Sequence, residues 1–206
     1  MSNPVLDQLR SQIQTLERGA FERELRSLSS TDSDLNAWLP QAGFSLGSFV
    51  ELLQENSGFG AYSLALKLSR HAADLKPVWA VLDTEATFNP RAAEAFGWEL
   101  KNLVLVRSSL PDGGWAFAQF LRSKDIGACF WASSSMDNMV FRRLQLAAER
   151  GGGLGFVIRP MAALRKPCWG SLRIQVSAGG ANRVRLKLLH ARGQPDVSQK
   201  EIEVTL

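Results

Sequence analysis

Short apolar runs and amphipathic stretches alternate through the middle of the chain. Continuous apolar runs, which are typical of buried strands, occur at residues 48–53, 77–82, 102–106, 126–132 and 154–159. Apolar positions that recur every three or four residues predict helices near 61–73, 89–97, 113–123 and 136–150. Because strands and helices alternate from residue 48 to 159, we predict a mostly parallel sheet with helices on both faces.

The pattern changes near the C-terminus. Alternating residues rich in Val, Ile and Leu predict antiparallel strands at 171–177, 182–190 and 200–206. The run Ala178-Gly179-Gly180-Ala181 provides a turn between the first two. The predicted fold class is therefore α/β, with a mostly parallel sheet flanked by helices and an antiparallel C-terminal extension.

The N-terminal segment adds a further element. Residues 1–28 are predicted to form an amphipathic helix, residues 29–42 a linker with a short helical turn, and residues 43–206 the main domain. The apolar positions of the helix follow the heptad spacing of a narrow seam: Leu6, Leu9, Ile13 and Leu16. A seam of this width is typical of a contact between two helices, so we expect self-association or docking on another protein. The alternative is that the helix folds back on its own domain.

Composition narrows the class of protein. Of the 206 residues, 45% are hydrophobic and 21% are charged, which suits a globular domain with a buried core. The cysteine pair, Cys129 and Cys168, and two histidines are too few for a disulfide scaffold or a metal site rich in Cys or His. No apolar run reaches the roughly 18 residues of a membrane span, and no leader peptide is recognisable. We expect a reduced, cytoplasmic protein without metal, cofactor or membrane contact.

The positive charge is concentrated in one segment. Residues 159–192 contain no acidic residue and carry the basic residues Arg159, Arg165, Lys166, Arg173, Arg183, Arg185, Lys187 and Arg192. Such asymmetry indicates contact with nucleic acid or with an acidic protein, and a solvated sheet face is the alternative. The candidate contact residues are the basic ones other than Arg159 and Arg173, together with Trp169. Trp115 also lies beside a glycine and is a second tryptophan that could stack on a base.

A glycine-containing loop follows the first predicted strand, where a nucleotide-binding loop would lie. Its residues are Glu55, Gly58, Gly60, Ala61 and Tyr62. Nucleotide-binding loops of the form GxxxxGK[ST] use Lys to neutralise phosphate and a hydroxyl to hold Mg²⁺. Here Ala61 and Tyr62 occupy those two positions, and no Lys or Arg occurs from 51 to 66. We therefore expect a tight strand-to-helix connection rather than a site of ATP hydrolysis.

The other polar clusters offer no catalytic group. The predicted strand 126–132 is followed by Ser133-Ser134-Ser135 instead of the aspartate that holds Mg²⁺ in phosphoryl-transfer enzymes. The three serines have no neighbouring histidine and no GxSxG motif. The acidic run Asp83-Thr84-Glu85 follows the strand at 77–82, and we expect it to cap the next segment. We assign no catalytic residue.

Several segments resemble a known superfamily. Residues Gly43–Leu52, Ala80–Glu85 and Phe96–Leu103 resemble the RecA core, and the whole resemblance covers roughly residues 35–195. Within that superfamily the chain is most similar to the ImuA family, through the run Arg142-Arg143-Leu144-Gln145-Leu146-Ala147-Ala148-Glu149 and the segment Val184–Gly193. The cell-division inhibitor SulA shares the same core, so a SulA-like protein is an alternative.

The resemblance implies a function that the residues alone do not reveal. ImuA proteins are accessory proteins of DNA-damage-induced (SOS) translesion synthesis and mutagenesis, and many have eroded nucleotide loops. The family implies contacts with ImuB, with RecA and, through ImuB, with an error-prone polymerase subunit. Weak DNA binding is a further expectation. The alternatives are a SulA-like inhibitor of cell division and a RecA-like ATPase.

Overall fold

The computed structural model describes residues 27–30, 32–40, 42–56, 58, 60–108, 110–134, 136–194, 197 and 200–206. The predicted N-terminal helix lies outside these residues except at its end. There Ser27–Leu28 forms strand β1, which pairs antiparallel with β2 (Phe44–Ser45), so the prediction of helix up to residue 28 was wrong. Leu28 is buried in the main core, and strand pairing places it there.

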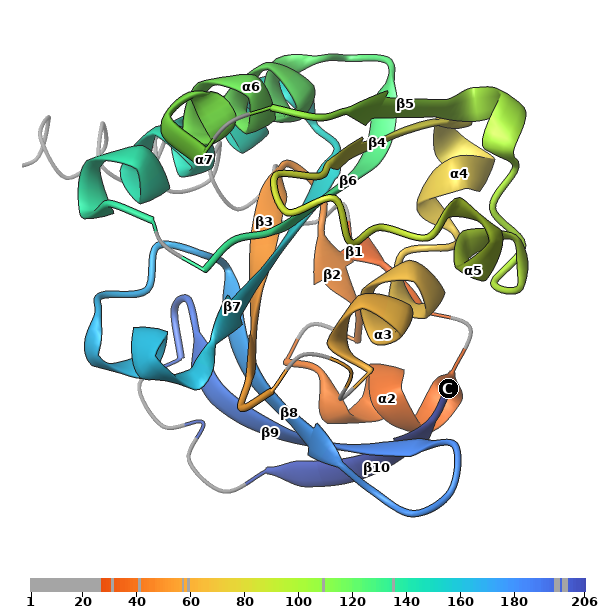
Figure 1. Ribbon diagram of the computed structural model, residues 1–206. Helices are drawn as coiled ribbons and strands as arrows, with labels where there is room; N and C mark the ends of the chain where they lie inside the picture. The colour runs from red at the N-terminus through yellow and green to blue at the C-terminus, as the bar shows by residue number, and fades with distance from the viewer. Residues whose placement is uncertain are drawn as a thin grey trace, which may run out of the picture.

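Strands and helices alternate through the middle of the chain (Figure 1). The elements from the first helix onward are α2 (Ser33–Trp38), β3 (Ser48–Gln54), α3 (Ala61–Leu68), α4 (Ala72–Leu75), β4 (Val78–Leu82), α5 (Pro90–Glu94), a 3₁₀ turn η1 (Leu100–Asn102), β5 (Leu103–Val106), α6 (Leu110–Arg122), β6 (Ile126–Ala132), α7 (Asn138–Gly151) and β7 (Leu154–Pro160). The chain ends with a second 3₁₀ turn, η2 (Met161–Arg165), β8 (Leu172–Ala178), β9 (Arg183–Ala191) and β10 (Glu201–Thr205).

All the strands that the sequence predicted are confirmed, with ends that shift by at most one residue. The helix predicted over 61–73 is interrupted, because α3 ends at Leu68 and α4 begins at Ala72. Between them the hydroxyl of Ser69 bonds to the carbonyl oxygen of Ala65 at 2.6 Å, inside the protein. A serine that bonds back to the preceding turn competes with the regular helical pattern.

The main sheet has eight strands in the order β10-β9-β8-β3-β7-β6-β4-β5. Every pair from β8 to β5 is parallel, and the β8–β9 and β9–β10 pairs are antiparallel. Strand β8 was expected to be wholly antiparallel, yet it pairs parallel with β3. The connection over residues 161–171 explains this, because it returns the chain across the sheet so that β8 starts at the same edge as β3. The sheet is thus mostly parallel with an antiparallel end, as predicted.

Two hydrophobic layers cover the sheet. One face packs against α2, α3, α4 and α5, and the other packs against α6 and α7. The segment 29–42, expected as a linker, contains α2 and buries Leu35, Trp38 and Leu39 in the first layer. Asp32 caps α2 by accepting hydrogen bonds from the backbone N–H groups of residues 34 and 35.

Successive strand residues face opposite layers. In β3, Val50 and Leu52 face the α3 layer, whereas Phe49 faces the α7 layer. Glu51 therefore lies on the α7 side of the sheet, and it is fully buried. No helix formed by the described residues is long and apolar enough to cross a membrane.

Candidate functional site

The strand–loop–helix unit of β3 and α3 ends in a left-handed glycine. Gly60 is the N-cap of α3, with φ 82°, and provides no side-chain hydrogen bond to the first turn. A methyl group on Gly60 would lie 2.6 Å from Leu206 Cδ1 and 2.9 Å from Val184 Cγ1. The start of α3, where a phosphate would need open backbone N–H groups, is therefore packed against apolar side chains from β9 and the chain end.

Tyr62 fills the space beside this helix start. Its ring lies 5.4 Å from that of Phe88 and 6.1 Å from that of Phe130, between the centroids. The hydroxyl oxygen is buried and has no hydrogen-bond partner among the described residues. Burial, together with the nearby Asp83 and Cys129, raises the pKa of Tyr62 well above its usual value. A hydroxyl in this setting stays protonated, and the ring of Tyr62 packs against the first hydrophobic layer.

Asp83 follows β4 and organises the next turn. Its carboxylate accepts hydrogen bonds from the backbone N–H groups of Thr87, at 3.0 Å, and Phe88, at 3.4 Å. The Nε atom of Arg107 lies 3.6 Å from the same carboxylate. Asp83 therefore holds the turn after β4, but the expected cap of the next helix is supplied by Asn89 at the start of α5, and Glu85 is exposed. Among the described residues no group of three or more His, Cys, Asp and Glu side chains is arranged to hold a metal ion.

The residues after β6 are structural as well. Asp137 caps α7 by accepting a hydrogen bond from the backbone N–H of Met139 at 3.0 Å. Trp131, at the strand end, donates from its indole N–H to the hydroxyl of Thr84 at 3.3 Å. Ser133 is buried and Ser134 is exposed, and Ser135 lies outside the described residues. These contacts give Asp137, Trp131 and Thr84 structural roles at this end of the sheet.

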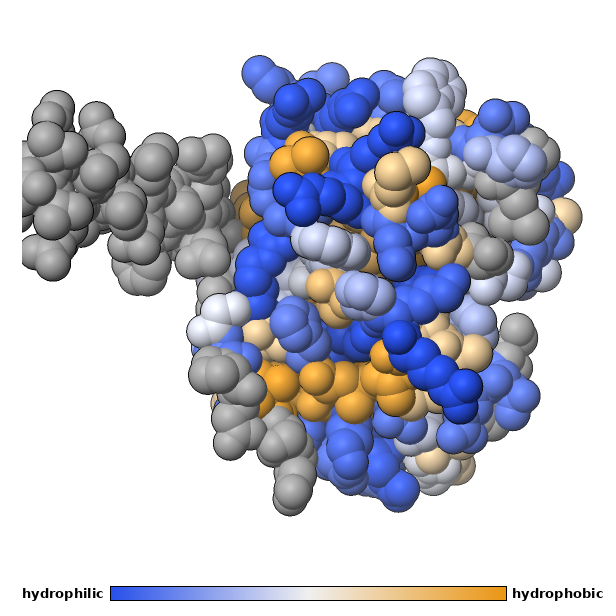
Figure 2. Space-filling view, turned by 90° about the vertical axis from the view of Figure 1, so that its left-hand side faces the viewer, coloured by the Kyte–Doolittle hydropathy of each residue, from blue (hydrophilic) through white to orange (hydrophobic). Residues whose placement is uncertain are grey.

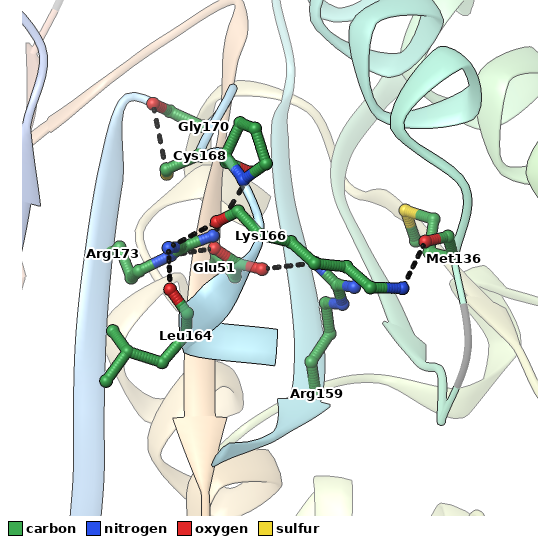
Figure 3. Close-up of polar contacts among 9 residues, drawn as sticks. Glu51, Met136, Arg159, Leu164, Lys166, Cys168, Gly170 and Arg173 are labelled. Atoms are coloured by element: carbon green, nitrogen blue, oxygen red, sulfur yellow. Dashed lines mark hydrogen bonds and ion pairs between the residues drawn. The ribbon is translucent and has the colours of Figure 1, made fainter. Parts of the chain in front are cut away.

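The strongest polar feature is a buried ion cluster that the sequence did not predict. Glu51 of β3 receives the guanidinium of Arg159 from β7, with Nη1 2.7 Å from Oε1. On its other side, Nε of Arg173 from β8 donates to Oε2. Figure 3 shows both guanidinium groups converging on the one carboxylate. All three side chains are at most 6% exposed, so two positive charges share one negative charge inside the protein.

Arg173 also binds the crossover connection that covers the cluster. Its guanidinium donates to the carbonyl oxygens of Lys166 at 3.0 Å, Pro167 at 3.3 Å and Leu164 at 3.4 Å (Figure 3). The Nζ atom of Lys166 reaches the carbonyl oxygen of Met136, before α7, at 3.4 Å. The connection is thus fixed to the sheet on one side and to the α7 end on the other.

Cys168 completes this buried region. Its thiol donates a weak hydrogen bond to the carbonyl oxygen of Gly170, with 3.9 Å between sulfur and oxygen. Burial and the adjacent Glu51 carboxylate raise the pKa of the Cys168 thiol to about 11. Burial alone raises the pKa of Cys129. Both cysteines are free thiols in the structure, and neither has the lowered pKa of a reactive cysteine.

The predicted basic segment divides into three groups. Arg159 and Arg173 are the buried pair described above, so they are not available to a partner. Arg183 and Arg185 both lie against Glu203 of β10, with nearest N–O distances of 3.8 and 3.0 Å. Lys187 lies 3.2 Å from Glu201 in the same way. The antiparallel pairing of β9 and β10 places these acids opposite the bases, which a count along residues 159–192 does not reveal.

The third group surrounds Trp169. Arg165 and Lys166 are exposed on the crossover connection, and Arg192 donates to the carbonyl oxygen of Trp169 at 3.0 Å. Arg192 also lies 3.6 Å from Glu149 of α7. The indole ring of Trp169 is half-buried, and the guanidinium of Arg142 lies 5.2 Å from its centroid. Trp169 is therefore already engaged by a cation and by the α7 layer. Arg165 and Lys166 are exposed residues, although the Nζ atom of Lys166 is bound to the carbonyl oxygen of Met136.

Three further sets of candidate residues were named from the sequence. Trp115 lies within α6, and it is 70% exposed. In the glycine-containing loop before α3, Glu55 is exposed, and a Cβ atom added to Gly58 would lie in open space. The seam residues Leu6, Leu9, Ile13 and Leu16 lie outside the described residues.

The comparisons with known proteins do not add a family. No protein-family model matches the chain, and no curated protein matches it.

Proposed function

We propose that this chain is a non-catalytic accessory protein of DNA-damage-induced translesion synthesis and mutagenesis. It acts through contacts with ImuB, with RecA or with both, as the resemblance to the ImuA family implies. The observation that carries the proposal is the start of α3. Gly60 packs against the apolar side chains of Leu206 and Val184, and Ala61 and the half-buried Tyr62 stand where phosphate-handling residues are expected. Nucleotide binding requires the opposite, an open loop with groups that neutralise phosphate.

The first test concerns nucleotide. Calorimetric titration of the full chain with Mg-ATP is expected to give no binding tighter than a Kd of about 100 μM, or about −5.5 kcal/mol. Tighter binding, or ATP hydrolysis above a boiled control, would support the RecA-like ATPase alternative instead.

The second test concerns partners. A tagged full chain, isolated from cells after DNA damage, is expected to retain ImuB and RecA, and purified ImuB and RecA are then tested one at a time. Self-association and docking through residues 1–26 are assessed by removing only those residues, because Leu28 belongs to the core. If neither protein binds and expression blocks division of undamaged cells, the SulA-like alternative holds.

The exposed bases of the crossover connection support weak DNA binding as a second property. Arg165 and Lys166 are solvent-exposed, whereas the bases of β9 lie against the acids of β10. We expect Arg165→Glu with Lys166→Glu to weaken single-stranded DNA binding more than Arg185→Glu with Lys187→Glu. For each phosphate neutralised, the slope of log affinity against log salt should be about −0.7. Equal losses in both double variants would refute this assignment.

A further inference from the structure

Helices α6 and α7 cover the face of the sheet opposite to α3 and the glycine-containing loop before it. A methyl group on Gly114 of α6 would lie 2.4 Å from Val140 Cγ1 of α7, and one on Gly151 would lie 1.9 Å from the carbonyl oxygen of Leu121. The two helices therefore touch at both ends and run in the same direction. Figure 1 shows the two helices side by side in its upper part, with their outer sides facing away from the sheet.

This surface has an unusual share of the exposed apolar side chains. Among the described residues, six large apolar side chains are exposed, and three of these are on the helix pair: Trp115, Met139 and Leu146. Trp115 is 70% exposed and Met139 is 66% exposed. They flank the contact of Gly114 with Val140, since each is the chain neighbour of one of those residues. Isolated exposed apolar residues are ordinary, but a large aromatic beside a methionine is typical of protein interfaces.

The same surface has more arginines than acids, with exposed Arg122, Arg143 and Arg150 against exposed Asp112 and Glu149. Residues 139, 143, 146 and 150 recur at helical spacing along one side of α7, so that Arg143 and Arg150 alternate with the two apolar side chains. Arg122 ends α6 beside the C-terminal end of α7. Within the described part of the chain, none of these three arginines has an ion-pair partner, in contrast to the paired bases of β9. Figure 2 looks at the left-hand side of Figure 1, the side on which α7 lies, and shows a mainly hydrophilic face with a narrow apolar band across it.

We propose that the outer surface of α6 and α7 binds an acidic amphipathic segment of a partner protein. The apolar side of such a segment covers Trp115 and Met139, and its carboxylates pair with Arg143 and Arg150. Charge complementarity argues for this occupant, because three unpaired guanidinium groups favour carboxylates and repel a basic segment. Trp, Met and Arg are also the residues enriched at binding hot spots and interface cores. The proposal goes beyond the accessory function and does not depend on which partner that function uses.

A direct test uses two labelled peptides with the full chain. One is an amphipathic peptide with Leu and Phe on one helical face and Glu on the other, and the second has Lys in place of every Glu. Fluorescence anisotropy is expected to show binding of the acidic peptide at least about tenfold tighter than that of the basic one, a difference of about 1.4 kcal/mol. Higher salt should narrow this difference.

Surface variants locate the binding. Two double variants are expected to lower the affinity for the acidic peptide by about tenfold or more. They are Trp115→Ala with Met139→Ser, and Arg143→Glu with Arg150→Glu. The matched control is Leu75→Ser with Arg91→Glu, which changes an exposed leucine and an exposed arginine in the opposite layer and should leave affinity within about twofold. Circular dichroism checks that each variant is folded.

Three results would overturn the proposal. The first is equal binding of the acidic and basic peptides, and the second is equal weakening by the control variant. The third is loss of single-stranded DNA binding or of self-association, rather than of peptide binding, in Arg143→Glu with Arg150→Glu. That last result would assign the surface to nucleic acid or to a second copy of the chain.

Discussion

Arg173 stands directly opposite Glu51 on the neighbouring parallel strand, and its guanidinium joins that buried carboxylate to the crossover connection. Arg173 thereby links three parts of the molecule: the central strand β3, the first strand of the C-terminal extension and the loop that covers both. A charge can remain buried here because each guanidinium has a carboxylate or carbonyl partner.

Removing the shared negative charge is expected to destabilise the fold strongly. Glu51→Gln leaves Arg159 and Arg173 buried without a counter-charge, at a cost of about 3–5 kcal/mol in the free energy of unfolding. Urea denaturation followed by circular dichroism measures the change. Glu94→Gln, at an exposed position of α5, is the control, and its free energy of unfolding should lie within about 0.5 kcal/mol of that of the parent. A loss below about 1 kcal/mol in Glu51→Gln would contradict the burial of two charged guanidiniums.

The loop contacts of Arg173 give a separate, local prediction. Arg173→Leu removes the donors to three loop carbonyls, so trypsin is expected to cut after Arg165 several times faster than in the parent. Cleavage after Lys166 is blocked by the following proline. Arg159→Leu is the matched control, because it disrupts the same ion cluster without touching the loop carbonyls. Equal cleavage rates in the two variants would show that global instability, and not the loop contact, controls access.

Helix and strand order could be predicted from this sequence because the apolar runs and the helical spacings are long and separate. The parallel pairing of β8 with β3 could not, since an alternating strand has the same pattern whichever way its neighbour runs. Arg173 in that strand looks like one more base of the C-terminal segment, and only the register places it opposite Glu51. The neutralisation of Arg185 by Glu203 was hidden for the same reason.

The glycine-containing loop before α3 could be predicted only in part. The lack of Lys and Ser/Thr could be read directly from Ala61 and Tyr62. The covering of Gly60 by Leu206 could not, because these residues are far apart in the chain and meet only through the order of the strands.

This contact can be tested with a pair of glycines. Gly58 and Gly60 both have positive φ, at 93° and 82°, so alanine is strained at either position, by about 1–2 kcal/mol. Only at Gly60 would the added methyl group also meet Leu206 and Val184. Gly60→Ala is therefore expected to lower the free energy of unfolding by more than Gly58→Ala, as measured by thermal denaturation under identical conditions. Equal losses would mean that the chain end does not pack closely on the start of α3.

The stability of the fold should depend on pH through His190. This residue lies opposite Arg173 in the β8–β9 pairing. Burial lowers the pKa of His190 from 6.5, and Arg173 and Arg192 lower it further, whereas Glu51 opposes the shift. Between the lowered pKa and 6.5 the unfolded chain binds more protons at this position than the folded chain. The contribution of His190 to stability is therefore complete above pH 6.5 and decreases as pH falls through that window.

His190→Gln tests this directly, because glutamine stays neutral throughout the range. Urea denaturation of the parent and the variant is compared at pH 8 and at half-unit steps down to pH 5. The free energy of unfolding of the parent is expected to fall more steeply below pH 6.5 than that of the variant. The free energy of unfolding of the parent minus that of the variant should therefore be smaller at pH 5 than at pH 8. A difference that stays constant across the series would show that His190 has the same pKa in the folded and unfolded chains, and that neither burial nor the two arginines acts on its ring.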